Sequence, residues 1–269
     1  MTPTLTPPAA DKALSLLDPA DAPDLDLLVT EDDTPVDNLY VEKLQRLLTE
    51  PLYSSWPGPG DNRTFLALAN VGLFYSTIKP PIVPDMMLSL DVPAELYPRS
   101  KEHRSYFTWI MGKVPDLALE VVSDLRGEEE GEKMRTYARL NIPLYVIYDP
   151  LEHLGHGILR AFAQNRKRYV SISPTALDDL GLGLTLWEGE YEGQHETWLR
   201  WCDAKGQLIA TGKEQAAAER RRADQQEHRA EQLEHRAEQL VHRAETAEAR
   251  IARLEAQLRE SGLQPRNGE

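Results

Sequence analysis

Two short apolar runs near the middle of the chain, separated by a charged stretch, predict the centre of the fold. The first covers residues 117–122 and is interrupted by Glu120 alone, and the second covers residues 144–148. Runs of this length bounded by turn signals predict buried strands. Between them, residues 132–140 carry apolar side chains at three- and four-residue spacing, which predicts a short helix that Asn141 ends. Two strands joined through a helix predict a crossover unit with parallel neighbours.

Apolar positions near helical spacing predict an amphipathic helix upstream that runs to about Glu50. We expect Asp37 to cap its start and Pro51 to end it. Residues 65–76 follow a turn-rich passage and predict either a pair of strands or one strand with an irregularity at Gly72.

The clearest periodicity lies at the end of the chain, where residues 227–233 and 234–240 share the sequence EHRAEQL. Apolar residues seven apart predict a coiled-coil helix over residues 213–262, about 75 Å long. Three of four g-to-e pairs join Arg to Glu, which favours a parallel homodimer. Because four of the nine seam residues are alanine, a single solvated helix held by Glu and Arg pairs stays open as an alternative. The seam consists of Ala230, Leu233, Ala237, Leu240, Ala244, Ala247, Ile251, Leu254 and Leu258.

Composition limits the expected cellular location of the protein and its expected binding partners. The single cysteine, Cys202, excludes an intramolecular disulfide framework and suits a reducing cytoplasm. No signal peptide is visible, and no apolar run approaches the roughly 20 residues that cross a bilayer, so we expect a cytoplasmic protein without a membrane partner. Composition predicts a disordered leader over residues 1–23 and a disordered tail over residues 263–269. The net charge of −14 argues against tight nonspecific DNA binding by an isolated monomer.

Two carboxylates on predicted neighbouring strands mark a candidate metal site. An unpaired carboxylate is costly to bury, so Glu120 needs a cationic partner or a metal ion. Asp85 stands at the start of the apolar run 86–90, which could lie alongside. Together with Lys133 from the following helix, these acids would hold a divalent cation that acts on a phosphodiester. Asp116 lies on the same strand face as Glu120, but roughly 13 Å away, which is too far to share one metal.

A segment between residues 92 and 112 interleaves basic and aromatic residues, a pattern suited to phosphate contact and base stacking. Arg99, Lys101 and Arg104 are therefore candidates for substrate binding. The alternative is a surface insertion whose aromatic side chains pack on the core.

Three segments, VPDMML, PDLALEVVS and EKMRTYARLNIPLYVIYDP, carry a family resemblance when taken together. With their flanking sequence, over roughly residues 25–258, they resemble the Uma-type restriction endonuclease family (domain of unknown function 820), a branch of the PD-(D/E)XK nuclease superfamily. The resemblance implies an α/β, restriction-endonuclease-like core over residues 24–212. In that core a central mixed sheet flanked by helices carries the acidic site, and a long C-terminal coiled-coil helix follows.

The resemblance also assigns roles to individual residues. Asp85 and Glu120 match the two acids of the superfamily and would bind Mg²⁺ or Mn²⁺. The superfamily pattern has a lysine two positions after the second acid, where this chain has Val122. In the family a lysine from the following helix takes that role, and Lys133 is the match.

Four further positions match the family. Glu42 would supply another acid from the first helix, and Ser123 could donate a hydrogen bond to a carboxylate or to substrate. Tyr137 and Tyr145 also match, and core packing is expected for both.

The function implied is a magnesium-dependent endonuclease with DNA as its substrate, acting as a homodimer through residues 213–262. Two alternatives stay open. One is a catalytically inactive nuclease-fold protein that serves as an interaction or oligomerisation module. The other is a hydrolase of a different phosphodiester, in RNA or a nucleotide.

Overall fold

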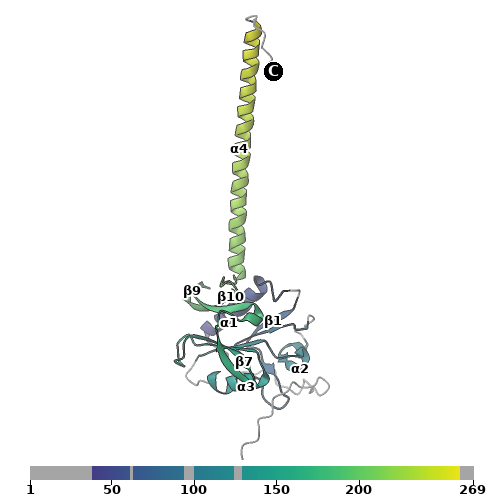
Figure 1. The fold of residues 1–269 in the computed structure, drawn as a ribbon, viewed down its shortest axis with the longest axis vertical. Helices are drawn as coiled ribbons and strands as arrows, with labels where there is room; N and C mark the ends of the chain where they lie inside the picture. Colours follow the sequence, from purple (N-terminus) through teal and green to yellow (C-terminus); the bar gives the residue numbers. More distant parts are fainter. Residues whose placement is uncertain (1–37, 61–62, 94–99, 124–128, 261–269) are drawn as a thin grey trace, which may run out of the picture. The chain divides into compact units, whose positions relative to one another are not determined.

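The computed structural model describes residues 38–60, 63–93, 100–123 and 129–260 (Figure 1). The chain divides into two units, residues 1–212 and residues 213–269, and each is described by itself. The expected leader at residues 1–23 and tail at residues 263–269 lie outside the described residues.

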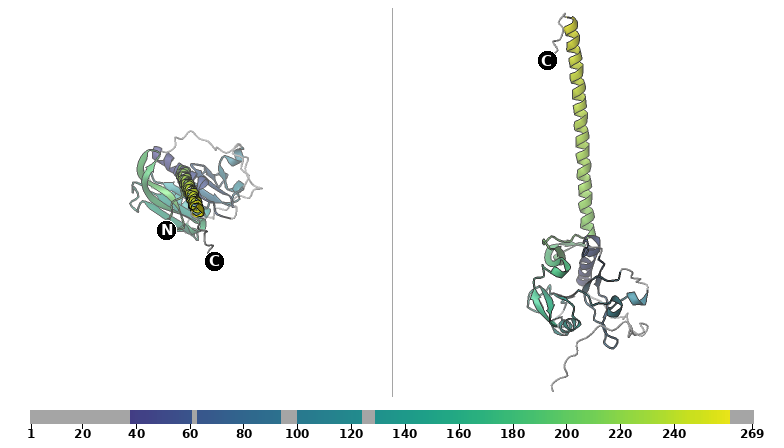
Figure 2. Two further views of the ribbon diagram at one scale, coloured as in Figure 1. Left: turned by 90° about the horizontal axis from the view of Figure 1, so that it is seen from above. Right: turned by 45° about the vertical axis from the view of Figure 1, so that its right-hand side comes forward.

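A mixed sheet of six strands forms the centre of the first unit (Figure 1, Figure 2). Its strand order is β1-β3-β5-β6-β7-β8, in which β5 and β6 are parallel and the other neighbours are antiparallel. The predicted mixed α/β class and the parallel crossover pair are confirmed. The strands are β1 (Phe65–Ala69), β3 (Met86–Leu90), β5 (Leu117–Val121), β6 (Leu144–Tyr148), β7 (Leu159–Asn165) and β8 (Arg168–Ile172).

Helices and two small sheets surround this sheet. Residues 65–76 form two strands, β1 and β2, that belong to different sheets, because β2 pairs with β4. The further elements are α1 (Leu39–Ser54), β2 (Leu73–Phe74), η3 (Lys101–His103), β4 (Tyr106–Phe107), α2 (Thr108–Met111), η4 (Glu129–Lys133), α3 (Met134–Leu140), η5 (Asp178–Leu180), β9 (Leu182–Tyr191) and β10 (Gln194–Asp203).

Different elements cover the two faces of the central sheet. On β5, Leu119 and Val121 pack in a core shared with α1 and the β9–β10 hairpin. Ala118 and Val122 pack on the other face in a core shared with Tyr137 of α3. Because successive side chains of a strand point to opposite faces, Glu120 belongs to the α3 face.

Helix α1 differs from its prediction at both ends. Asp37 lies outside the described residues, and the cap is Asn38, whose side-chain oxygen accepts the backbone N–H groups of Tyr40 and Val41, each at 3.0 Å. At the C-terminal end, the prediction that Pro51 ends the helix is wrong, since the helix continues to Ser54. Near the end of a helix, the missing N–H of proline removes one hydrogen bond, and the buried Pro51 ring packs in the core.

The second unit consists of most of helix α4 (Gly212–Glu260), a continuous helix of 49 residues. The predicted long C-terminal helix is confirmed as far as Glu260. Within the described chain no residue of α4 is buried, and Leu233 and Ile251 of the predicted seam are 60% and 56% exposed. A search of the described residues finds no helix that is long and apolar enough to cross a membrane.

The cap at Asn38 gives a direct test of the start of α1. We expect Asn38→Ala to lower the free energy of unfolding by about 1 kcal/mol, because the first turn loses its side-chain acceptor. Asn38→Asp keeps an acceptor and should remain near wild type. Urea denaturation followed by circular dichroism measures both variants, and an equal loss in the two would contradict the capping role.

Candidate active site

Glu120 is fully buried on β5, and its carboxylate accepts hydrogen bonds from two side chains. Lys133 donates from Nζ to Oε2 at 2.7 Å, and Tyr137 donates from its hydroxyl to Oε1 at 2.5 Å. Both donors come from the η4–α3 segment that connects β5 to β6. Their spacing of four residues places them on one face of that segment. The crossover connection therefore supplies both partners of the buried acid.

Asp85 stands opposite Glu120 on the neighbouring strand. The antiparallel register pairs Met86 of β3 with Leu119 of β5, so the next position along each strand brings Asp85 beside Glu120. Asp85 Oδ2 accepts the backbone N–H of Val121 at 2.7 Å. This bond extends the hydrogen bonding between the two strands beyond their last paired residues and holds the Asp85 carboxylate at the strand edge.

The charges in this cluster are strongly coupled. Burial raises the pKa of Glu120 to about 8, and the charge of Asp85 adds to the shift, while Lys133 and Tyr137 offset part of it. Burial lowers the pKa of Lys133, but its attraction to Glu120 outweighs burial, so the pKa is raised and the ammonium stays charged at neutral pH. When Glu120 is ionised, its carboxylate and that of Asp85 repel one another, and a single cation, Lys133, balances them.

The chemistry of these two acids fits a hard divalent cation. Asp85 and Glu120 supply oxygen donors of the kind that Mg²⁺ and Mn²⁺ prefer. Each carboxylate oxygen has two lone pairs, so the two donors already bound to Glu120 leave capacity for a metal. A cation between the acids would also relieve the repulsion that raises the pKa of Glu120.

No group of three or more His, Cys, Asp or Glu side chains arranged to hold a metal occurs in the part of the chain that the structure describes. The remaining ligands would therefore come from water or from substrate. That is usual for Mg²⁺, which commonly binds through one or two carboxylates and retains several waters.

A known protein family matches the part of the chain that contains this cluster. Residues 34–181, more than half of the chain, match the family model described as "Uma2: Putative restriction endonuclease". The chain belongs to the Uma2 family. The matched range contains Asp85, Glu120 and Lys133. Membership confirms the resemblance and supports a restriction-endonuclease-like nuclease.

Comparisons with individual proteins add less. A search of curated proteins finds no match. Among solved structures, the chain is similar to a protein described as a putative nuclease belonging to DUF820 from Anabaena variabilis ATCC 29413, with 15% sequence identity and a TM-score of 0.35. The likeness covers 61% of this chain and 80% of that chain.

Glu42, which the family pattern matched to a further acid, lies apart from the cluster of this Uma2 protein. Helix α1 packs on the sheet face opposite α3, because its apolar side chains share a core with Leu119 and Val121. The Glu42 side chain is 52% exposed and forms an ion pair with Arg46 at 3.0 Å. The structure therefore does not bring Glu42 together with Glu120.

Three of the four expected substrate-binding residues lie in the described part of the chain. Ser123 follows β5 and is exposed. Lys101 begins η3 and is partly buried, and Arg104 follows the same turn and is exposed. Arg99 lies outside the described residues.

The aromatic residues around η3 are buried, as the alternative of a packed surface insertion expects. Tyr106 and Phe107 have no exposed surface, and Trp109 is 5% exposed. Tyr106 also forms a hydrogen bond of 2.8 Å with Ser89 of the central sheet. These rings are not available to stack on nucleobases in this conformation.

Asp116 has a structural role at the other end of β5. Its Oδ2 accepts the backbone N–H of Leu90 at 2.7 Å and the ammonium of Lys113 at 2.6 Å. These bonds tie the beginning of β5 to the end of β3. Asp116 therefore lies away from Glu120, as strand geometry predicted.

Tyr137 is the member of the cluster that sequence reasoning missed. Its ring packs in the core, as expected, but its hydroxyl also donates to Glu120. The signal was the spacing of four residues from Lys133, which places two hydrogen-bond donors on one helical face. Tyr145 packs as expected too, and its hydroxyl donates to the backbone oxygen of Glu129 at 2.8 Å.

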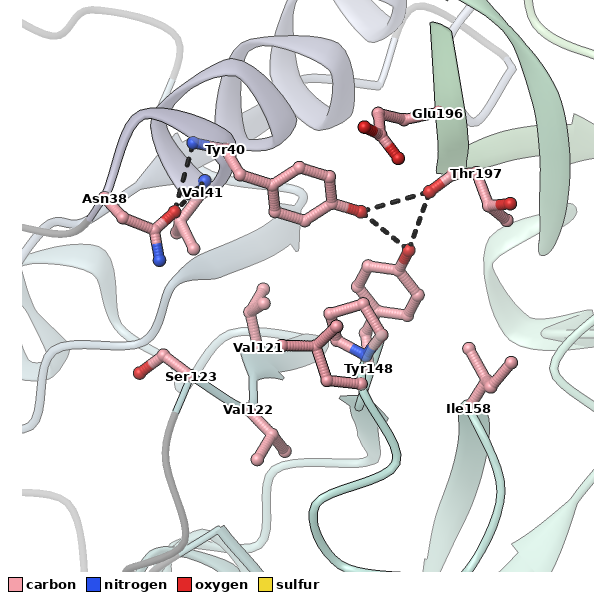
Figure 3. Close-up of a pocket in the computed structure, with 12 residues that line it drawn as sticks. Asn38, Tyr40, Val41, Val121, Val122, Ser123, Tyr148, Ile158, Glu196 and Thr197 are labelled. Atoms are coloured by element: carbon pink, nitrogen blue, oxygen red, sulfur yellow. Dashed lines mark hydrogen bonds between the residues drawn. The ribbon is translucent and has the colours of Figure 1, made fainter.

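A separate pocket of about 500 Å³ opens where β5 and β6 end, beside the start of α1 (Figure 3). The hydroxyls of Tyr40 and Tyr148 lie 2.8 Å apart, and both donate to the Thr197 carbonyl oxygen at 3.1 Å (Figure 3). Ser123 and Glu196 also line the pocket, and the described lining contains no Lys, Arg or His. An acidic pocket without a cation does not suit a phosphate group.

The bond from Tyr137 to Glu120 predicts a measurable difference between two tyrosines. At pH 9, above the pKa of Glu120, Tyr137→Phe should lower the free energy of unfolding by about 1.5–3 kcal/mol, because a hydrogen bond to a charged group is lost. Tyr145→Phe is the matched control, since its hydroxyl donates to a neutral carbonyl and its loss should cost about 1 kcal/mol. Urea denaturation compares the two, and equal losses would contradict a special role for the Tyr137 hydroxyl.

Proposed function

We propose that this Uma2 protein is a divalent-metal-dependent endonuclease that hydrolyses phosphodiester bonds in DNA. The observation that carries the proposal is the placement of Asp85 opposite the buried Glu120, with Lys133 bonded to Glu120. A structural ion pair between Glu120 and Lys133 would be more stable without a second carboxylate beside it. A site that retains this repulsion is better explained by chemistry that needs both acids.

Asp85 and Glu120 would hold the metal ion. When bound, such an ion polarises a phosphoryl oxygen and lowers the pKa of a water molecule. The protein contributes orientation, because the strand register and the bond from the Val121 N–H keep the two acids in place.

Lys133 would stabilise negative charge instead of removing a proton. Its raised pKa keeps it charged at neutral pH, so it cannot act as a general base there. One of its three N–H groups is bonded to Glu120, and its side chain is 30% exposed, so the others can reach a water molecule or a phosphate oxygen. Tyr137 would hold the Glu120 carboxylate in one orientation while the metal binds.

Cleavage of DNA tests the proposed site. We expect the wild-type protein to nick or linearise supercoiled plasmid with Mg²⁺ or Mn²⁺, and Glu120→Ala and Lys133→Ala to reduce the rate at least about 100-fold, as is typical when a group that stabilises transition-state charge is lost. Glu132→Ala is the matched control, because Glu132 precedes Lys133 but is exposed. Agarose gels measure the rates.

Each outcome of that assay decides between functions. Identical products from wild type and Glu120→Ala would remove the nuclease assignment from this site. Cleavage of RNA without cleavage of DNA would replace the substrate. If neither nucleic acid is cut, while calorimetry shows that Mg²⁺ binds to wild type and not to Asp85→Asn, the site would be a metal-binding one without nuclease activity.

The proposal includes a dimer through helix α4, which would bring two sites to the two strands of a duplex. The heptad seam supports it, because Leu254 and Leu258 continue the line of Leu233 and Ile251, and all four are exposed in the single chain. Arg at the g positions faces Glu at most of the following e positions, which suits a parallel pair.

Substitution in the seam tests this dimer. The double variant Ile251→Asp/Leu254→Asp should reduce the mass measured by light scattering to that of one chain, because it places charges in the apolar contact. The double variant His235→Asp/His242→Asp changes two positions outside the seam and should leave the mass unchanged. A seam variant with the wild-type mass would eliminate the dimer through α4.

A further inference from the structure

A second pocket, of about 560 Å³, lies between α3 and the turn that joins β7 to β8. Four of its seven lining residues are Lys or Arg, and none is acidic. The charged members come from two elements that are about thirty residues apart in sequence but pack together. The lining consists of Met134, Arg135, Ala138, Arg139, Lys167, Arg168 and Tyr169.

Three of the four cations of this pocket are exposed. In the part of the chain that the structure describes, Arg135, Lys167 and Arg168 form no ion pair. Elsewhere on the surface, cations such as Arg46 and Arg63 do pair with carboxylates. Like charges gathered without acids repel one another, and an anion bound among them would remove that cost.

The backbone of the β7–β8 turn is strained where it presents these cations. Asn165 pairs with Arg168, which leaves Arg166 and Lys167 as a two-residue turn with φ of 48° and 66°. Turns of this kind favour Asn and Gly, because a side chain disfavours positive φ. Strained residues of this sort occur preferentially at binding and active sites. Two basic residues at these positions are thus unfavourable locally and add to the same positive cluster.

Helix α3 connects this pocket to the candidate active site. The segment that carries Lys133 and Tyr137 to Glu120 also carries Arg135 and Arg139 to the pocket. Arg139 follows Lys133 by six residues, so the two lie within about 9 Å along the helix axis. A DNA strand rises about 3.4 Å per nucleotide, so a strand that followed the helix would span this separation in two to three nucleotides.

Much of the negative charge of the chain lies near the start of its sequence. Residues 1–37 contain nine acidic residues and one basic residue, so they account for more than half of the net charge of −14. The pocket beside α1 contains Glu196 and no described cation, whereas the pocket beside α3 contains four cations. Of these two pockets, the one beside α3 is the one that suits a polyanion.

We propose that Arg135, Arg139, Lys167 and Arg168, with Arg166 beside them, form a basic pocket that binds the phosphate backbone of duplex DNA next to the cleaved bond. The proposal rests on the proposed nuclease function for the identity of the polyanion. Contacts of this kind fix the register of DNA without reading its sequence. The competing explanation is that the charges only protect β8, an edge strand, from pairing with other chains.

Binding of a fluorescent 30-base-pair duplex, without divalent metal so that no cleavage occurs, tests the pocket. Lys167→Glu/Arg168→Glu should weaken binding at least about 10-fold. It should also reduce the magnitude of the negative slope of log K against log salt by about two, one for each lost phosphate contact. The control Lys43→Glu/Lys205→Glu changes the net charge equally from α1 and the β10 side, and should bind within about twofold of wild type. Arg135→Ala, on the helix, should change the slope by about one and checks the result without altering the strained turn.

The outcomes separate this proposal from the proposed function. The pocket proposal would be overturned if the two double variants bound the duplex equally, or if the wild-type protein did not bind it. It would also be overturned if Lys167→Glu/Arg168→Glu weakened the binding of RNA but not of DNA. If the Lys167→Glu/Arg168→Glu variant binds poorly while no metal supports cleavage, the DNA surface stands and the nuclease function fails. If that variant binds and cleaves like wild type while Glu120→Ala is inactive, the nuclease function stands and the pocket fails.

Discussion

The burial of one carboxylate, that of Glu120, is the constraint on which the rest of the site depends. An acid with no exposed surface must be hydrogen-bonded and paired, and in this protein both partners come from the segment that follows its own strand. The crossover from β5 to β6 therefore both connects the two strands and supplies the partners of Glu120. It returns the chain over the α3 face of the sheet and carries Lys133 and Tyr137 to the two oxygens of Glu120.

The sheet holds this segment at both ends. Tyr145 of β6 donates to the backbone oxygen of Glu129 at the start of η4, and Tyr169 of β8 donates to the backbone oxygen of Ile142 just after α3. The two tyrosine rings stack with centroids 5.5 Å apart, and Tyr137 packs beside Tyr145. One aromatic layer thus fixes the helix that serves Glu120 and supports the basic pocket. A displacement of α3 would disturb both.

Local patterns predicted the elements of the site better than its contacts. The two apolar runs and the helix between them were recognised because strands and helices have distinct periods. The placement of Asp85 near Glu120 was expected from the family resemblance, because the period of a strand does not say which strand lies beside it. The hydroxyl of Tyr137 was missed because ring burial alone explained the residue. The separation of Glu42 from Glu120 depends on which sheet face α1 covers, and the basic pocket depends on α3 packing beside β8. Both depend on how elements far apart in the sequence pack together, which the spacing of residues within one segment does not predict.

The positions of the two kinds of cation along α3 distinguish their roles. A helix carries partial positive charge at its start and partial negative charge at its end, so Arg139 in the last turn is favoured there, whereas Lys133 before the first turn is disfavoured. Burial also lowers the pKa of Lys133. Attraction to the carboxylates, above all to Glu120, outweighs both effects, and Glu120 is itself opposed by Asp85. Glu120 and Lys133 are thus each placed against local preference and each is stabilised by the other, while Asp85 adds a repulsion. Such an arrangement is expected where selection has acted on chemistry instead of on stability.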